Sequence, residues 1–244
     1  MTYCVALHLD KGLVFMADTR TNAGVDNISS VKKLRTWSVP GERVVTVLSA
    51  GNLATTQTVI SLLEERTFHP SERDPSILTQ PTMFEVARLV GSTLREVVVE
   101  HRGMGGPDSE GEFGATMIVG GQIKGMKPRL FLVYPEGNFI ETTVDSPFFQ
   151  VGEIKYGRPI LLRAFDPTMS FEEAVKLLVV SFDSTIKANL SVGLPVDLHV
   201  YVDDSLEEGE VRRFERRDPY FAEISQTWGS ALREAFGSLP DFEF

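Results

Sequence analysis

The chain has 244 residues, 42% of them hydrophobic, with a net charge of −10 and a pI of about 5.0. This acidic balance excludes the basic surface through which proteins bind nucleic acid or anionic membrane, so we expect neither partner. Residues 1–244 are expected to form one domain, because undivided domains often reach this length. The N-terminus lacks a signal-peptide pattern and no stretch is apolar enough to span a bilayer, so we expect a cytoplasmic protein.

The first residues predict an antiparallel hairpin. Residues 3–9 and 12–18 are apolar runs rich in Val, Leu and Phe, and Asp10-Lys11-Gly12 between them is a turn signal. A loop of two or three residues pairs positions whose numbers sum to about 21 or 22. Thr2 then lies opposite residues 19–20, and the turn returns Asp18 to within a residue or two of it.

The rest of the chain alternates between runs of strands and runs of helices. Further strands are expected at 31–37, 43–49, about 113–119, 129–134, 138–143, 147–151 and 198–202. Helices are expected at 53–66, 83–101, 156–165, 171–189 and about 219–236. Asn52 is a candidate helix cap, and Ser170 with Glu173 forms a candidate capping box.

Loops are expected where breaker or charged residues gather. Residues 19–30, the Pro- and Ser-rich stretch 70–81 and the acidic run 203–210 have this composition. Strands in runs followed by helices in runs argue against a parallel doubly wound sheet. We therefore expect an α+β fold in which antiparallel sheets carry paired helices on their outer faces.

Thr2 is the first candidate for chemistry. If Met1 is removed, Thr2 carries a hydroxyl nucleophile and a free α-amine, and such an amine has an ordinary pKa of about 7.7–8.0, suited to a general base near neutral pH. Many chains begin Met-Thr by chance, so this position alone is a weak signal.

Other kinds of site find little support. The sequence has no Gly-x-Ser-x-Gly elbow and no phosphate-binding Gly-rich loop. His8, His69, His101 and His199 do not pair at metal-ligand spacing, so we expect no metal and no cofactor. His8 and His199 are expected in strands with hydrogen-bonded rings. The single cysteine, Cys4, is expected as a small buried apolar residue.

Several motifs at matching spacing resemble one known family. They are Thr2, Gly12-Leu13-Val14-Phe15-Met16-Ala17-Asp18, Thr21-Asn22-Ala23-Gly24, Val31-Lys32-Lys33-Leu34 and Ser49-Ala50-Gly51. The sequence resembles the proteasome β-subunit superfamily of N-terminal-nucleophile hydrolases, which includes the bacterial HslV-type peptidases. Residues 1–6 and 18–24 resemble most closely the bacterial branch called Anbu. The resemblance covers the whole chain and implies a four-layer αββα sandwich.

The resemblance also implies roles for individual residues. The Thr2 hydroxyl would attack an amide carbonyl, and its own α-amine would accept the proton. Lys33 would lie beside Thr2, and its charge would favour the deprotonated nucleophile. Asp18 would pair with Lys33, and the backbone N–H of Gly51 would stabilise the oxyanion.

Substrate binding and supporting positions follow from the same resemblance. Arg20, Thr21 and Asn22 would line the substrate channel and pair with an extended peptide. The resemblance departs from the family at Gly152-Glu153, where Glu replaces Ser, and at Asn189, where the family has Asp. Glu153, Asn189 and Ser191 are therefore candidates only for supporting the site.

Three functions remain open from the sequence. The leading one is a threonine-type endopeptidase that cleaves peptides or proteins within a ring or helical assembly of identical subunits. The second is an amidase of the same chemistry that acts on small molecules. The third is a catalytically weak scaffold, favoured by Met1, Glu153 and Asn189. The long helix 83–101 is a candidate for partner contact, and an ATP-dependent unfoldase stays open as a further partner.

Overall fold

The computed structural model of the chain describes residues 2–22, 28–68, 74–104 and 113–244. Two five-stranded antiparallel sheets form its centre. The first has the order β10-β1-β2-β11-β12, with β1 at Tyr3–Leu9, β2 at Gly12–Asp18, β10 at Phe148–Gly152, β11 at Val196–Val202 and β12 at Glu210–Phe214. The second has the order β5-β6-β7-β8-β9, with β5 at Leu34–Val39, β6 at Arg43–Gly51, β7 at Ala115–Ile123, β8 at Arg129–Val133 and β9 at Phe139–Glu141.

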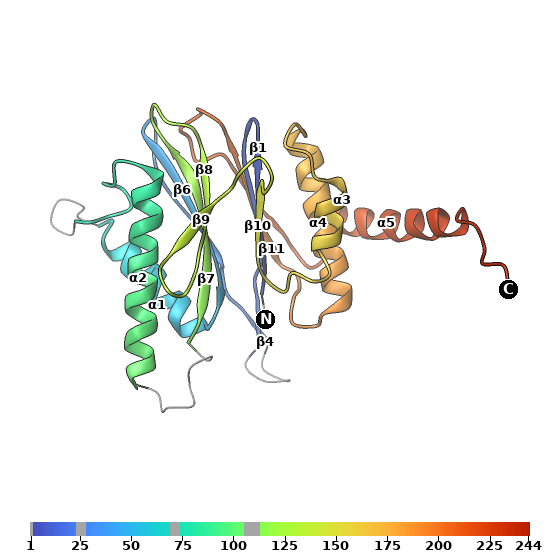
Figure 1. The fold of residues 1–244 in the computed structure, drawn as a ribbon, viewed down its shortest axis with the longest axis horizontal. Helices are drawn as coiled ribbons and strands as arrows, with labels where there is room; N and C mark the ends of the chain where they lie inside the picture. Colours follow the sequence, from blue (N-terminus) through green and yellow to red (C-terminus); the bar gives the residue numbers. More distant parts are fainter. Residues whose placement is uncertain (1, 23–27, 69–73, 105–112) are drawn as a thin grey trace.

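Helices cover the two outer faces of this pair of sheets. Helices α1 (Leu53–Glu65) and α2 (Met83–Met104) lie on the second sheet, and α3 (Arg158–Ala164) and α4 (Phe171–Ala188) lie on the first. Figure 1 shows the four layers edge-on, with α5 (Pro219–Gly237) leading away from the body to the C-terminus. The expected α+β fold, a four-layer αββα sandwich, is confirmed.

The hairpin of β1 and β2 has the register that its turn predicts. Cys4 lies opposite Ala17 and Leu9 lies opposite Gly12, so paired positions sum to 21. The register continues to the site, because the Tyr3 N–H donates to Asp18 Oδ1 over 3.0 Å. The turn chemistry of residues 10–12 therefore fixes which residue reaches the N-terminus.

The helix caps also follow the sequence. The Asn52 side chain accepts a hydrogen bond from the Thr55 N–H, and Ser170 and Glu173 form both bonds of the capping box. Each cap satisfies N–H groups that the first helical turn leaves without a partner. Helices α1 and α4 consequently begin one residue after the predicted caps.

Four strands differ from the expectation. Residues 19–30 contain two short paired strands, β3 (Arg20–Asn22) and β4 (Ile28–Ser30), and the strand expected at 31–37 begins only at Leu34. Strand β12 is additional: it begins at Glu210, the last residue of the acidic run, and pairs with β11. All but the last of its side chains are exposed, so it lacks the apolar alternation by which a strand is recognised.

The strands at the centre are apolar on both faces because each face meets a different layer. Along β1, Tyr3, Val5 and Leu7 pack toward α3 and α4, whereas Cys4 and Ala6 pack between the two sheets. A third apolar cluster lies between the second sheet and α1 with α2. Cys4 is fully buried, as expected, and burial raises the pKa of its thiol.

His199 joins the two sheets through a polar contact inside the apolar layer. Its ring stacks on Phe15, and its Nε2 bonds to the Glu208 carbonyl oxygen, so Nε2 carries the proton. Nδ1 then accepts from the Thr46 hydroxyl of β6 at 2.9 Å. Both ring nitrogens are thus satisfied, as the sequence predicted, and the ring is held neutral.

This buried ring predicts a loss of stability in acid. Burial lowers the pKa of His199 below its ordinary value of 6.5, so the unfolded chain binds more protons as the pH falls. The free energy of unfolding is expected to decrease from pH 7 to pH 5, and to decrease less in the His199→Gln variant. His8 is shifted in the same direction and remains in the variant, so the slope should shrink rather than vanish. Urea titrations at each pH measure it, and an unchanged slope would contradict this account.

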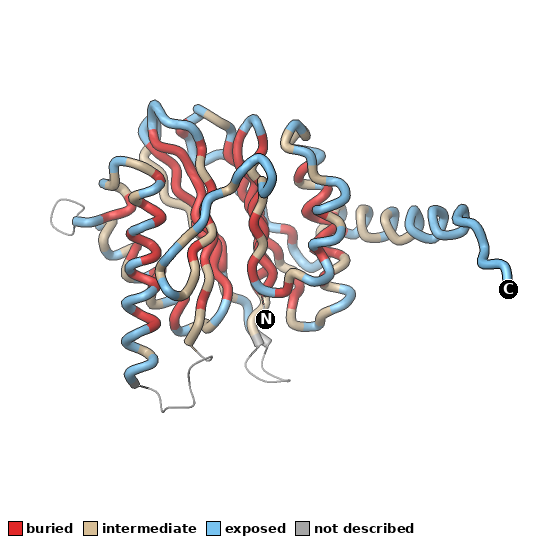
Figure 2. The backbone as a smooth tube through the Cα atoms, in the orientation of Figure 1, coloured by how far each residue is buried: buried red, intermediate tan, exposed pale blue. Residues whose placement is uncertain are grey.

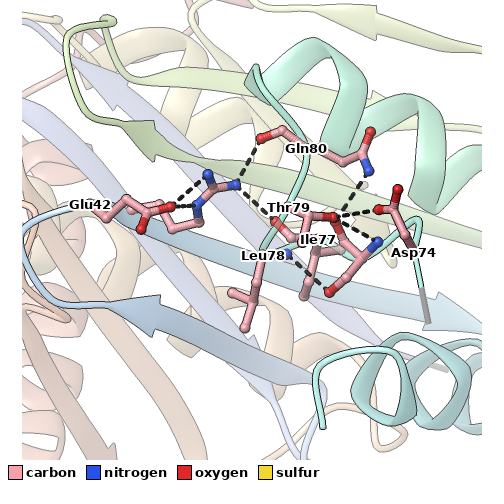
Figure 3. Close-up of polar contacts among 8 residues, drawn as sticks. Glu42, Asp74, Ile77, Leu78, Thr79 and Gln80 are labelled. Atoms are coloured by element: carbon pink, nitrogen blue, oxygen red, sulfur yellow. Dashed lines mark hydrogen bonds and ion pairs between the residues drawn. The ribbon is translucent and has the colours of Figure 1, made fainter. Parts of the chain in front are cut away.

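The segment before α2 is fixed to the second sheet by the guanidinium of Arg43, at the start of β6. It donates to the carbonyl oxygens of Ile77 and Gln80, the latter at 2.8 Å, and pairs with Glu42. Figure 3 shows this cluster, in which the Thr79 hydroxyl also bonds to Asp74. A buried arginine here supplies donors to carbonyl groups that no strand pairs.

Candidate active site

Asp18 and Lys33 form a buried ion pair. Lys33 Nζ lies 2.7 Å from Asp18 Oδ1 and 2.6 Å from the Arg20 carbonyl oxygen, so two of its three N–H donors are held. Asp18 comes from the end of β2, and Lys33 comes from the segment just before β5. The backbone of that segment is anchored too, because the Ser49 N–H of β6 donates to the Lys33 carbonyl oxygen.

The surroundings of Asp18 shift the pKa of its carboxyl in two opposite directions. Burial raises the pKa of the Asp18 carboxyl above its ordinary value, and the Lys33 ammonium and the Tyr3 N–H oppose this shift. Neither side chain of the pair is more than 7% exposed. Since each charge is removed from water, each depends on the other.

Thr2 is positioned by the edge strand β10. The Glu153 N–H donates to the Thr2 carbonyl oxygen at 2.7 Å. Gly152, which precedes it, has φ of +86°, and a Cβ there would lie 1.9 Å from the same oxygen. Glycine is therefore required at position 152, where the chain passes directly against Thr2.

A cavity of about 260 Å³ opens beside Thr2. Its walls come from the β3 region, the segment before β5, the end of β6 and the first half of α1. They comprise Thr2, Thr21, Val31, Lys32, Lys33, Arg35, Ser49, Ala50, Gly51, Leu53, Thr56, Gln57, Ile60, Ser61 and Glu64. Thr2, Lys33 and Gly51 lie far apart in the sequence, and all three line this one cavity. Asp18 does not line it, but it is buried next to Lys33.

Gly51 ends β6 with φ of +121°. A Cβ at this position would lie 2.5 Å from the Gly114 carbonyl oxygen, so no other residue fits without a shift of β7. Asn52 follows at once as the cap of α1. The cavity wall therefore changes from strand β6 to helix α1 at Gly51, whose N–H the sequence predicted to stabilise the oxyanion.

The three residues expected in the substrate channel differ in where they lie. Thr21 lines the cavity. Arg20 is not one of the described residues that line the cavity. Its side chain instead donates to the Leu190 carbonyl oxygen at 2.6 Å and lies against Gly193. Asn22 belongs to β3, and its side chain is outside the description. The motif residues Ala23 and Gly24, with Met1 and His69, also lie outside the described residues.

The three supporting candidates form one chain of hydrogen bonds. Asn189 Nδ2 donates to Glu153 Oε2 at 2.9 Å, and Asn189 Oδ1 accepts from the Ser191 N–H at 2.9 Å. The two departures from the family pattern are therefore in contact with one another. The Asn189 side-chain amide donates to the carboxyl group of Glu153. An ionised Asp at position 189 has no such donor, so it could not make this bond.

The sequence did not indicate several groups that position the site. They are the Tyr3 N–H, the Arg20 carbonyl oxygen and the Glu153 N–H. Each is a backbone group: every residue type supplies a carbonyl oxygen and every type except proline supplies an N–H, so no motif could have revealed them. Only the register of the strands could have placed them.

The described parts of the chain offer neither a metal site nor a membrane-spanning helix. In residues 2–22, 28–68, 74–104 and 113–244, no three His, Cys, Asp or Glu side chains are arranged to hold a metal ion. No helix within those same residues is long and apolar enough to cross a membrane.

Comparison with protein families matches residues 2–200 to the proteasome subunit. The chain therefore belongs to the proteasome subunit family. Its fold, two antiparallel sheets covered by helices on their outer faces, agrees with this assignment.

Solved structures of Anbu proteins match the whole chain. Anbu, the ancestral beta-subunit, from Yersinia bercovieri is 44% identical with a TM-score of 0.93, and all of both chains is covered. Anbu from Hyphomicrobium sp. strain MC1 is 49% identical with a TM-score of 0.88, again over all of both chains. A helical assembly of the Anbu complex from Pseudomonas aeruginosa is 45% identical with a TM-score of 0.92, covering 99% of this chain and 98% of the other. A search of curated proteins found no match.

Proposed function

We propose that this protein is a threonine hydrolase that cleaves amide bonds of peptides with Thr2 as nucleophile after Met1 is removed. The observation that carries the proposal is the buried Asp18–Lys33 pair at the wall of the cavity that Thr2 also lines. A fully buried charge pair beside a nucleophile perturbs its ionisation, which is typical of catalytic sites.

In the proposed reaction the Thr2 Oγ attacks the carbonyl carbon of the scissile amide, and the Thr2 α-amine accepts the hydroxyl proton. The Lys33 charge favours the deprotonated nucleophile, and the Gly51 N–H donates to the oxyanion of the tetrahedral intermediate. The amine then returns its proton to the leaving nitrogen as the C–N bond breaks. Water hydrolyses the resulting Thr2 ester and regenerates the hydroxyl.

The peptide would run across the cavity mouth, with one of its side chains in the cavity. Thr21 is the described channel residue that lines the wall, and β3 offers backbone groups for pairing with an extended substrate. Arg20, in this proposal, acts by holding the Lys33 ammonium through its carbonyl group rather than by touching substrate. Glu153, Asn189 and Ser191 hold the segment that fixes the Thr2 carbonyl.

Assembly from identical subunits is the second part of the proposal. The similar protein from Pseudomonas aeruginosa is described as a helical assembly of the Anbu complex, and its chain matches this one nearly end to end. A helical or ring assembly would enclose the cavities of several subunits and restrict access to extended peptides. Contact through α2, and an ATP-dependent unfoldase as a further partner, remain predictions.

The proposal is tested by the mass of protein purified from its native cell and its reaction with a peptide β-lactone. We expect a mass that lacks Met1 and a single adduct, which peptide mapping places on Thr2. The Thr2→Ala variant should form no adduct. The Thr21→Ala variant, which alters a neighbouring wall hydroxyl, should still be labelled. A chain that keeps Met1 uniformly and forms no adduct would instead support the scaffold reading.

A small-molecule amidase is distinguished by substrate size. The peptide proposal expects extended peptide amides to be hydrolysed faster than short acyl amides by the chain without Met1. The reverse order, with the adduct still on Thr2, would move the assignment to the amidase.

A further inference from the structure

Helix α5 carries an apolar stripe that continues beyond the body of the protein. Phe221 and Ile224, in its first turns, pack in the cluster between the first sheet and α4. Trp228, Leu232 and Phe236 follow on the same face at intervals of four residues. Leu232 is 50% exposed and Phe236 is 76% exposed, so the stripe leaves its own core at about Trp228.

The direction of α5 prevents the chain from covering this stripe itself. The helix runs away from α4 toward the C-terminus (Figure 1), and Figure 2 shows its outer half exposed on all sides. Every residue from Ala231 to Phe244 is exposed. A helix with a large apolar face and no neighbour is typical of a binding element.

The same chain has an apolar groove beside the start of α5. This groove, of about 420 Å³, lies over β11 and β12 beside the first turns of α4. Its floor includes Val200, Val202 and Phe214, and Phe171, Val175 and Tyr220 form its sides. Val202 is 46% exposed, although it belongs to an internal strand of the sheet.

We propose that α5 of one subunit lies in the β11–β12 groove of a second copy of this chain, with Trp228, Leu232 and Phe236 as its anchors. Anchors spaced at i, i+4 and i+8 are what an amphipathic helix presents to an apolar groove. The groove lining also carries Glu172, Glu210 and Arg212, of which Arg212 pairs with Asp218, so Arg233 beside the stripe of α5 can pair with either Glu. Tyr220 bounds the groove at the root of the same helix, so one subunit cannot fold its rigid α5 back into its own groove.

The contact joins two different surfaces, so it does not close on itself in a pair. Each subunit keeps one free helix and one free groove after binding a neighbour. Such a head-to-tail contact produces a ring if the rotation closes and an open helix if it does not. The inference rests on the proposed assembly of identical subunits and names the surfaces that build it.

Two variants, each defective in one surface, test the contact. Leu232→Asp with Phe236→Asp damages the helix stripe, and Val202→Asp damages the groove. Each variant alone should sediment as a smaller species than the native chain. An equimolar mixture should give a new complex of one chain of each variant in native mass spectrometry, because the intact helix of one fits the intact groove of the other. Gln226→Asp with Ser230→Asp, on the opposite face of α5, should leave assembly unchanged.

Circular dichroism and melting temperature check the fold of each variant. If Val202→Asp melts early, Val202→Lys replaces it. A groove variant that assembles like the native chain, or a mixture that forms no complex, overturns the inference while leaving the assembly proposal intact. If deleting residues 240–244 alone abolishes assembly, the C-terminal tail occupies the groove and the inference is wrong. A native chain that stays monomeric at all concentrations overturns both.

Discussion

Replacing Lys33 by methionine is expected to slow the acylation of Thr2 by about a hundredfold to a thousandfold, a loss typical of removing one electrostatic group from a preorganised site. The ammonium is held at 2.7 Å from Asp18 and shares a cavity wall with Thr2. Methionine keeps the length and apolar stem of lysine and removes the charge, so packing should change little.

The rate is measured on protein without Met1 as the second-order rate constant of adduct formation with a peptide β-lactone. Lys11→Met is the matched control, since Lys11 lies in the turn at the other end of the β1–β2 hairpin, far from Thr2 along both strands. Its rate should stay within about threefold of native. A Lys33→Met protein that is acylated at the native rate would remove Lys33 from the mechanism.

Replacing Asp18 by leucine is expected to destabilise the fold by about 3–5 kcal/mol, because the Lys33 charge then stays buried without its counter-charge. The Tyr3 N–H, which donates to the same carboxylate oxygen, also loses its acceptor. The double variant Asp18→Leu with Lys33→Met should lose less than the sum of the two single losses, by about 2 kcal/mol.

Urea unfolding of the native chain, both single variants and the double variant gives this coupling energy. Glu141→Leu serves as the reference for an exposed pair. Arg129, the partner of Glu141, is about a third exposed. The Glu141→Leu variant should therefore lose only about 1 kcal/mol or less of unfolding free energy. Additive losses for Asp18 and Lys33 would mean that the pair is not coupled in the folded state.

The sequence predicted the parts of the site that depend on register. The turn at Asp10-Lys11-Gly12 sets paired positions that sum to 21, and this alone brings Asp18 beside Tyr3. Lys33 and Gly51 lie on other segments, and only the family resemblance linked them to Thr2. Residue patterns describe local structure, whereas the meeting of distant segments depends on the packing of both sheets.

The features that the sequence did not predict have common physical reasons. Strand β12 is an edge strand with exposed side chains, so no apolar period marks it. The Arg20 side chain turns to the Leu190 carbonyl because Leu190 lies near in space only after β11 joins β2. The amphipathic pattern of α5 predicted a helix correctly, but such a pattern is the same whether the apolar face meets its own core or another subunit.

The hydrogen bonds around Thr2 bear on the removal of Met1 that the proposed function requires. Asp18 holds the N–H of Tyr3, and Glu153 holds the carbonyl of Thr2, so neither bond uses the Thr2 nitrogen. Cutting the Met1–Thr2 bond changes only that nitrogen, from an amide to an amine. Under the proposed function, removal of Met1 would therefore leave these two bonds in place, and maturation would require no refolding. The proposed removal of Met1 could then take place before or after assembly.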